Sequence, residues 1–325
     1  MAEDQAKVPD YLLPISTYPE AVKFANEQLK VFWLPDEISV EKDIQDVLTN
    51  FTEAEKHAAI MTLKLFSIYE THVGDEWWSG RFKQMFHNAD IHRMASVFSM
   101  FELAVHAPFY NKINELLNID TPEFYLSYLD TPALCERVKY IGKMVNHKND
   151  AVAIAAFSLI EGVILYSSFA FLKHYQSQGK NKLANVVRGI NFSVRDENLH
   201  SLAGAWAFKL KTEGLSEEEL YLIEKDVRET AIQIYEHELE IIKLLFEKGK
   251  IDGITAHQIE NFVQSRVNEC LKNFGFSKQF EVTYNPIADY FYKGINDYQF
   301  NDFFAGVGRE YNRNWNEDDF IWSNE

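Results

Sequence analysis

The chain is poor in residues that break helices and in residues that cross-link proteins. Its 325 residues include only 14 glycines and 8 prolines, which favours long helices joined by few turns. It has two cysteines, Cys135 and Cys270, which do not form a Cys-x-x-Cys pair. We therefore expect free thiols in a reducing compartment, with the cytoplasm as the location.

Positive charge is also scarce, with 32 basic against 49 acidic residues and a net charge of −17. Nucleic-acid backbones are bound by a basic face, so this balance argues against a nucleic-acid partner and indicates a solvated helical surface instead. The N-terminus lacks the basic region and apolar run of a signal peptide, and no uncharged run reaches the ~18 residues that span a bilayer. We expect no membrane partner. The lack of a Gly-rich phosphate loop predicts that this chain binds no nucleotide substrate.

What the sequence does contain is apolar residues in helical patterns. Hydrophobic residues make up 46% of the chain and include 25 phenylalanines, enough to bury a large core. Thr52 and Ser216 each precede a glutamate by three residues, which marks two helix N-termini. Strand-like alternation is rare, and residues 279–284 are its best case. We predict helices over residues 18–30, 52–83, 90–117, 132–146, 150–178, 181–211, 216–248 and 255–273.

The domain organisation follows from composition. No Pro/Gly/Ser-rich linker divides the helical region, so we predict one all-α domain over residues 1–296. Residues 297–325 are polar, aromatic and mostly non-periodic, and they are predicted to form a flexible C-terminal tail. Large aromatic residues near the end of that tail, Phe320 and Trp322 among them, indicate a docking peptide whose side chains fill pockets on a partner.

Carboxylates and histidines recur on four of the predicted helices. A carboxylate and a histidine three or four residues apart share one helix face. Two lone carboxylates and two such pairs are the ligand plan of ferritin-like dinuclear metal proteins, so we predict a ferritin-like helical bundle with additional helices. Oxygen ligands with one imidazole per metal suit iron or manganese better than a structural zinc. The candidate metal ligands are Glu70, Glu102, His106, Glu161, Glu197 and His200.

The surroundings of Glu161 strengthen this hypothesis, because an isolated Glu-x-x-His pair is a weak signal. Glu161 lies within residues 155–169, which are almost entirely apolar. A carboxylate there either faces water or is paired with a cation, since burying it alone is costly. No other polar residue shares its face nearby, which favours the cation. Glu70 has a similar setting at the end of residues 65–70.

Several motifs together resemble the small, radical-generating subunit of class I ribonucleotide reductase, over residues from about 18 to the C-terminus. Arg195-Asp196-Glu197-Asn198-Leu199-His200 matches that family's Arg-Asp-Glu-x-x-His motif. Ile160-Glu161-Gly162 with Ser168-Phe169-Ala170 matches its third metal helix. Val31-Phe32-Trp33-Leu34-Pro35-Asp36-Glu37 matches the segment with the family's tryptophan, and Asn285-Pro286-Ile287 matches the start of its last helix.

The resemblance implies roles for individual residues. Tyr110 would carry the radical, and Trp33 and Asp196, with His106 between them, would form the chain through which an electron and a proton leave the site. Tyr311 in the tail would relay the radical to a separate large subunit, which reduces ribonucleotides to deoxyribonucleotides. A homodimer is expected. A dinuclear oxidase or monooxygenase and a metal-storage protein share the ligand plan, but neither has a need for the aromatic tail.

The second metal helix departs from the family pattern. The position three before His106, where the family has glutamate, is Leu103, and Glu102 lies four before it. Pro108 cannot bond to the carbonyl of Ala104, so a one-residue bulge there would absorb the extra residue. We expect a wide turn near Ala104 that lets Glu102 share a metal with His106. The alternative is a site that has lost a ligand.

Overall fold

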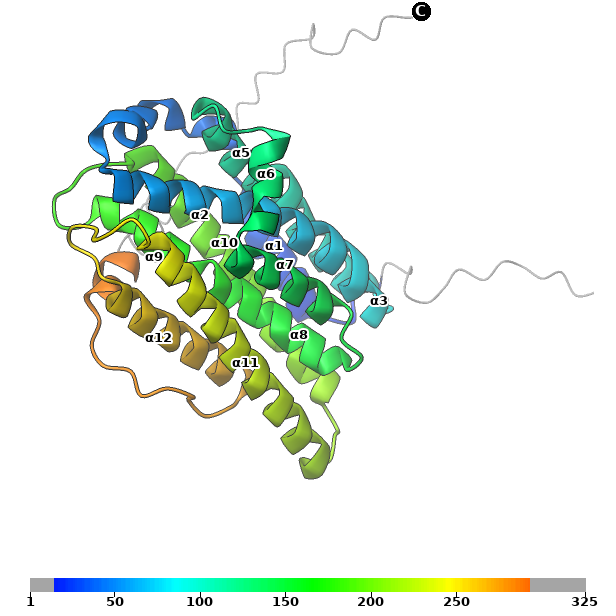
Figure 1. Cartoon of the computed structure of the whole chain (residues 1–325). Helices are drawn as coiled ribbons and strands as arrows, with labels where there is room; N and C mark the ends of the chain where they lie inside the picture. The colour runs from blue at the N-terminus through cyan, green and yellow to red at the C-terminus, as the bar shows by residue number, and fades with distance from the viewer. Residues whose placement is uncertain (1–14, 293–325) are drawn as a thin grey trace, which may run out of the picture.

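The structure, a computed structural model, describes residues 15–292, apart from the side chains of Ser67 and Ile68. Long helices lie lengthwise beside one another in a bundle (Figure 1). The predicted tail, residues 297–325, lies outside the described residues, and Tyr311 lies outside them as well. In chain order the helices of eight or more residues are α1 (Pro19–Lys30), α2 (Glu53–Thr71), α4 (Ala89–Phe101), α5 (Ala107–Leu116), α7 (Pro132–Val145), α8 (Asp150–Leu159), α9 (Tyr166–Lys173), α10 (Ala184–Thr212), α11 (Glu217–Leu245) and α12 (Ala256–Phe274).

Shorter helical pieces join these helices or extend them. Two are short α-helices, α3 (Phe82–Met85) and α6 (Pro122–Leu126). Four have a 3₁₀ geometry, namely η2 (Pro35–Glu37), η3 (Val40–Lys42), η7 (Ser127–Asp130) and η9 (His174–Gln176). Four more are π-helical, namely η4 (Asp46–Asn50), η5 (His72–Arg81), η6 (Glu102–His106) and η8 (Ile160–Ile164). Residues 286–292 form one further helical stretch, as predicted at Asn285-Pro286-Ile287.

The predicted all-α fold is confirmed, and the strand-like alternation over residues 279–284 does not form a strand. Among residues 15–292 there is no β-strand, and residues 281–285 have no regular structure. The side chain of Asn268 takes the place of a neighbouring strand. Its Oδ1 accepts from the backbone N–H of Gln279 and Phe280 at 2.8 and 3.0 Å, and its Nδ2 donates to the Phe280 carbonyl at 2.8 Å. These bonds satisfy the backbone locally.

Some helix starts are set by capping residues next to them, and one is set by a residue far away in the sequence. Capping boxes form at Thr52 and at Ser216, as predicted. The start of α10 is set by a distant residue. Asp43 accepts from the backbone N–H of Asn185 and Val186 at 2.6 and 2.7 Å, and α10 begins at Ala184 rather than at residue 181.

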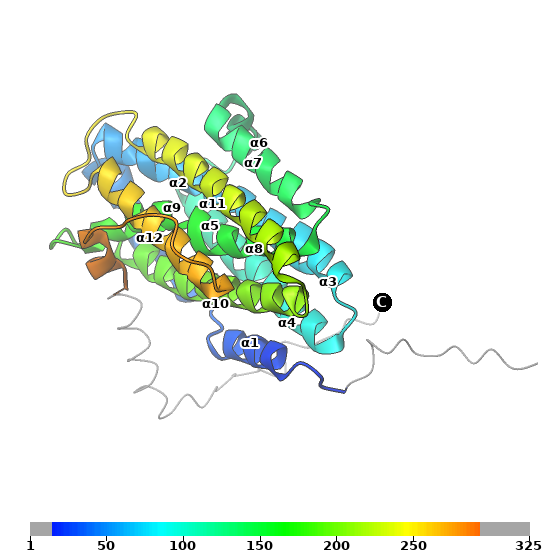
Figure 2. The ribbon, with the colours of Figure 1, turned by 90° about the horizontal axis from the view of Figure 1, so that it is seen from below.

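The centre of the bundle is the continuous helical run over residues 150–176. It is long and apolar enough to cross a membrane, but its most apolar stretch is completely buried inside the protein. Its first part, α8, lies between α10 and α11 (Figure 2). A helix that is apolar all around is expected to be surrounded by other helices, and this one is a core helix.

Three long helical runs, the central one included, contain a π segment. η5 directly follows α2, η6 joins α4 to α5, and η8 lies between α8 and α9. A π turn inserts one residue into a helix and changes the direction of its side chains. The predicted wide turn near Ala104 is therefore confirmed as η6, with Pro108 as the second residue of α5.

Candidate metal centre

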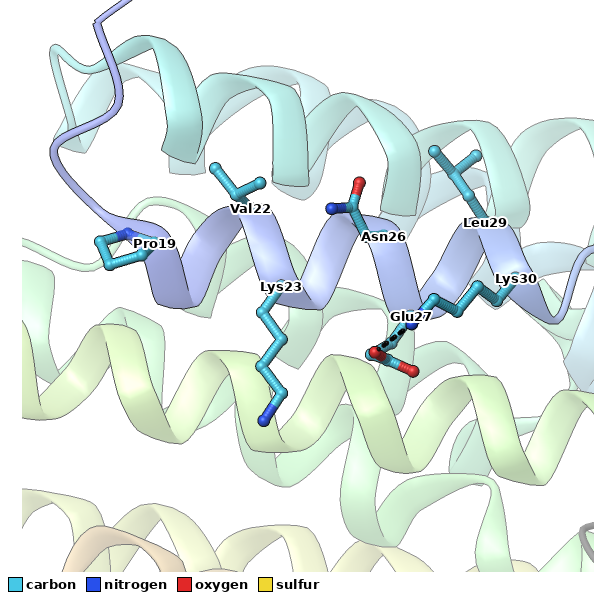
Figure 3. Close-up of a pocket in the computed structure, with 7 residues that line it drawn as sticks. All are labelled: Pro19, Val22, Lys23, Asn26, Glu27, Leu29 and Lys30. Atoms are coloured by element: carbon cyan, nitrogen blue, oxygen red, sulfur yellow. Dashed lines mark hydrogen bonds and ion pairs between the residues drawn. The ribbon is translucent and has the colours of Figure 1, made fainter.

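The six predicted ligands come together in the interior. Glu102, His106, Glu197 and His200 are 0% exposed, Glu70 is 1% exposed and Glu161 is 2% exposed. They come from α2, η6, η8 and α10, so residues far apart in sequence meet at one place. By contrast, the open hollow on the outer side of α1 contains none of them (Figure 3).

Two overlapping groups of possible ligands can be separated. Glu70 and His106 belong to the first group, and Glu161 and His200 belong to the second. Glu102 and Glu197 belong to both groups, and in each group the ligand atoms lie within 4.8 Å of one another. Each group thus offers one imidazole and three carboxylates, and two of those carboxylates are shared.

The distances show how the sharing arises. His106 Nδ1 lies 3.0 Å from Glu102 Oε2 and 3.2 Å from Glu197 Oε1. His200 Nδ1 lies 2.6 Å from Glu102 Oε1 and 3.8 Å from Glu197 Oε2. Each shared carboxylate therefore directs one oxygen towards each imidazole. The outer ligands are further away, with Glu70 at 3.7 Å from His106 Nδ1 and Glu161 at 3.7 Å from His200 Nδ1.

Burial and mutual repulsion dominate the electrostatics of the cluster. Burial raises the pKa of Glu70 and of Glu197 well above the usual value, and the charge of Glu102 adds to both shifts. Burial also opposes ionisation of Glu102, but the charges of His106 and His200 outweigh it and hold the pKa of Glu102 well below its usual value. Burial disfavours the charged form of His200, yet the adjacent Glu102 raises the pKa of His200 to about 9. The raised pKa values of Glu70 and Glu197 favour their neutral forms, so both carboxylates need positive charge beside them to ionise.

The donor set fits a pair of metal ions. Four buried carboxylates and two imidazoles are an unusual concentration of ligands in a protein interior. Glu70 Oε1 is buried without a hydrogen-bond partner, which is the state of an atom that a cation would satisfy. Glu102 lies close to both imidazoles, because the π turn of η6 brings it to the same side as His106. The alternative of a lost ligand on this helix is therefore not supported by the geometry.

A second layer of side chains positions the ligands, and the sequence did not point to all of it. Trp78 Nε1 donates to Glu161 Oε1 at 2.8 Å, across 83 residues of sequence. The ring of Phe98 lies 4.2 Å from that of His200, centroid to centroid. No spacing relates Trp78 to Glu161, so sequence reasoning had no signal for this contact.

Trp33, Asp196 and His106 form a hydrogen-bonded chain, but its order differs from the prediction, because Asp196 and not His106 lies in the middle. Trp33 Nε1 donates to Asp196 Oδ2 at 2.9 Å, and His106 Nε2 lies 3.2 Å from the same oxygen. Burial opposes the charge of Asp196, but its hydrogen bond with His106 and the charge of Arg195 lower its pKa below the usual value. His106 thus has Nδ1 towards the carboxylates and Nε2 towards Asp196, the arrangement that fixes a metal-binding imidazole.

Tyr110 is buried beside the cluster in an aromatic pocket. Its ring lies 4.4 Å from that of Phe66 and 5.1 Å from that of Phe109, centroid to centroid. Its hydroxyl donates to Ser193 Oγ at 2.9 Å. Burial, followed by the charge of Glu70, raises the pKa of Tyr110 well above its usual value, so the phenol is protonated. Ser193 was not predicted, although its position four residues before Glu197 places both on one face of α10.

Comparisons with known proteins agree with this arrangement. A family model described as "Ribonucleotide reductase, small chain" matches residues 11–286. The ribonucleoside-diphosphate reductase subunit beta of Bacillus subtilis (strain 168) is 26% identical over 328 residues, covering 93% of this chain and 93% of the relative. The corresponding protein of Treponema pallidum (strain Nichols) is 28% identical over 283 residues, covering 81% of this chain and 76% of the relative.

Solved structures share the fold. Dimanganese(II)-NrdF of Streptococcus sanguinis superposes with a TM-score of 0.77 at 22% identity, covering 86% of this chain and 97% of that one. A putative class I ribonucleotide reductase of Bacillus halodurans gives a TM-score of 0.76 at 22% identity, covering 84% and 100%. The predicted ferritin-like bundle is thereby confirmed.

Proposed function

The chain belongs to the ribonucleotide reductase small-chain family, as the small subunit of a class I enzyme, and we propose that the six-residue cluster holds its dinuclear metal centre. The observation that carries this proposal is the sharing of Glu102 and Glu197 between two groups of ligands. Glu70 and His106 would help to hold one ion, Glu161 and His200 would help to hold the other, and Glu102 and Glu197 would contribute to both. When bound, a pair of iron or manganese ions would supply the one-electron oxidising power that side chains lack.

The choice between iron and manganese is a matter for experiment. Carboxylate and imidazole ligands suit both metals. The Streptococcus sanguinis protein with the same fold holds dimanganese(II), so manganese is a natural first metal to test alongside iron.

We propose that Tyr110 holds the oxidising equivalent. It is completely buried, its aromatic pocket keeps water away, and it lies close enough to Glu70 for the two to interact electrostatically. The bond to Ser193 orients the hydroxyl before it loses its proton. The alternative is that the metal pair stores the equivalent itself.

We propose that the hole leaves along His106, Asp196 and Trp33, towards the catalytic large subunit. Trp33→Phe keeps an aromatic ring but removes the N–H that donates to Asp196, and phenylalanine is far harder to oxidise. Turnover with the large subunit should fall by at least about a hundredfold. The three residues act together, so the loss of one disables the whole chain. Metal content should not change, because Trp33 is not a ligand.

The matched control for this prediction is Trp206→Phe. Trp206 packs against Tyr18 and Phe24 and takes no part in the chain. Its substitution should leave turnover close to that of the wild type. Near wild-type turnover in Trp33→Phe would remove the proposed route.

The family implies a large subunit as partner, and we propose that residues 297–325 are the docking element, with Tyr311 as relay. Deleting residues 312–325 should weaken association, because the apolar anchors Phe320 and Trp322 are lost. Tyr311→Phe should leave the Kd for the large subunit unchanged and yet stop turnover. Normal reduction by the truncated chain at low partner concentration would contradict the docking role. The homodimer is likewise a proposal, and sedimentation equilibrium of the full chain tests it.

A further inference from the structure

Two buried basic side chains attach the last described residues of the chain to the segments that carry metal ligands. Arg266 on α12 is 4% exposed, and Lys173 at the end of α9 is 3% exposed. Both contact the pair Phe291–Tyr292, which directly precedes residues 293–325. We call these two basic residues and this pair the junction. None of the four takes part in the proposed radical chemistry.

Arg266 connects Tyr292 to the π turn of Glu161. Its Nε donates to the carbonyl of Gly162 at 3.1 Å, and Gly162 directly follows Glu161. One of its terminal nitrogens lies 3.1 Å from the Tyr292 hydroxyl. The guanidinium also lies over the ring of Tyr166, with its Cζ 4.1 Å from the centroid. A single rigid fork thus holds both groups, a geometry that lysine cannot reproduce.

The π turn has no room to move independently of α12. A Cβ on Gly162 would lie 2.4 Å from Cys270 Sγ and 2.6 Å from Ser201 Oγ. Cys270 is one helical turn after Arg266, so two successive turns of α12 press on η8. Because the interior is close-packed, a displacement of α12 must shift the turn that positions Glu161.

Lys173 makes the second connection, to the helix that carries Glu197 and His200. Its Nζ donates to the Phe291 carbonyl at 2.7 Å and to Asn191 Oδ1 at 2.5 Å. Asn191 lies on α10, two residues before Ser193. Burial lowers the pKa of Lys173 to about 7, and the amino group can donate in either charge state.

We propose that the junction couples docking of the large subunit to the metal centre, with Arg266 as a positioning residue for the turn that carries Glu161. This inference rests on the proposed function, because it takes residues 297–325 as the docking element and the cluster as the metal site. Coupling between two binding sites is reciprocal. Metal binding must therefore change the affinity for the large subunit by the same factor by which docking changes the affinity for metal.

The experiment measures the Kd of the full chain for its own large subunit, once metal-free and once loaded with Mn(II). In the wild type the two Kd values should differ by about fivefold or more, the usual size of such coupling. Tyr292→Phe removes only the hydroxyl that bonds to Arg266. In this variant the ratio should fall towards one, while Mn(II) stoichiometry and the melting temperature stay close to those of the wild type.

Tyr290→Phe is the matched control, because it removes a hydroxyl from the same short helix. That hydroxyl donates to the carbonyl of Ala170 at 2.9 Å and does not contact Arg266. The control should keep the wild-type ratio. Arg266→Lys provides an independent variant, and adding the large subunit should alter the Mn(II) paramagnetic resonance spectrum of the wild type but not of this variant.

A ratio of one in the wild type would overturn the coupling, as would an unchanged ratio in both Tyr292→Phe and Arg266→Lys. These results differ from failure of the proposed function. If the proposed function is wrong, the wild-type chain will take up no Mn(II) or will not bind the large subunit at all. The coupling hypothesis then fails as well, because it depends on both properties.

Discussion

Glu102→Ala should abolish the uptake of a metal pair and reduce bound metal from about two ions per chain to less than one. Glu102 directs one oxygen towards His106 and the other towards His200, so its loss removes a ligand from both groups at once. Metal analysis after reconstitution with Fe(II) or Mn(II) measures the effect. Glu161→Ala and His200→Ala each remove a ligand from one group and should also prevent dinuclear loading.

Glu76→Ala is the control for these variants. Glu76 lies near the cluster in sequence, but its side chain is 46% exposed and pairs with His72. Its loss should leave metal content unchanged. Circular dichroism should show a helical fold in every variant, since the ligands contribute little to the apolar core. Full dinuclear loading of Glu102→Ala would show that Glu102 is not a ligand. The four-residue spacing between Glu102 and His106 would then not serve metal binding.

Tyr110→Phe should eliminate a tyrosyl radical signal after oxidation of the metal-loaded protein. Phenylalanine fits the same aromatic pocket, but it lacks the phenol that would lose an electron and a proton. Turnover with the large subunit should fall by at least about a hundredfold. Electron paramagnetic resonance and a reduction assay on the same preparation measure both effects.

Tyr166→Phe is the matched control for Tyr110. Tyr166 is also completely buried in the same region, but its ring faces Arg266 and Phe291. The radical signal should persist in this variant. If Tyr110→Phe keeps full turnover and the wild type shows no tyrosyl signal, the oxidising equivalent is stored on the metals, and only this part of the proposal fails.

Local sequence patterns were sufficient to place most of the helices and to select the residues that meet in the cluster. Thr52 and Ser216 act within one helical turn, so their capping roles were predictable from neighbouring residues. The same holds for the wide turn around Glu102, because Pro108 excludes a regular helix there.

Features that depend on contacts across the bundle could not be predicted in this way. Asp43 sets the start of α10 from about 140 residues away in sequence, and Trp78 reaches Glu161 by means of the π segment η5. The π turn at Glu161 is another example, since no proline marks it and its shape depends on packing against Cys270 and Ser201. Ser193 could be recognised as the hydrogen-bond partner of Tyr110 only once α5 and α10 were placed side by side.

The most direct test of the metal centre is a crystal structure of the loaded protein with anomalous diffraction at the iron and manganese edges. We predict two anomalous peaks in each chain, one next to His106 and one next to His200, with Glu102 and Glu197 each contacting both ions. A single peak, or a pair of ions that Glu102 does not contact, would contradict the account.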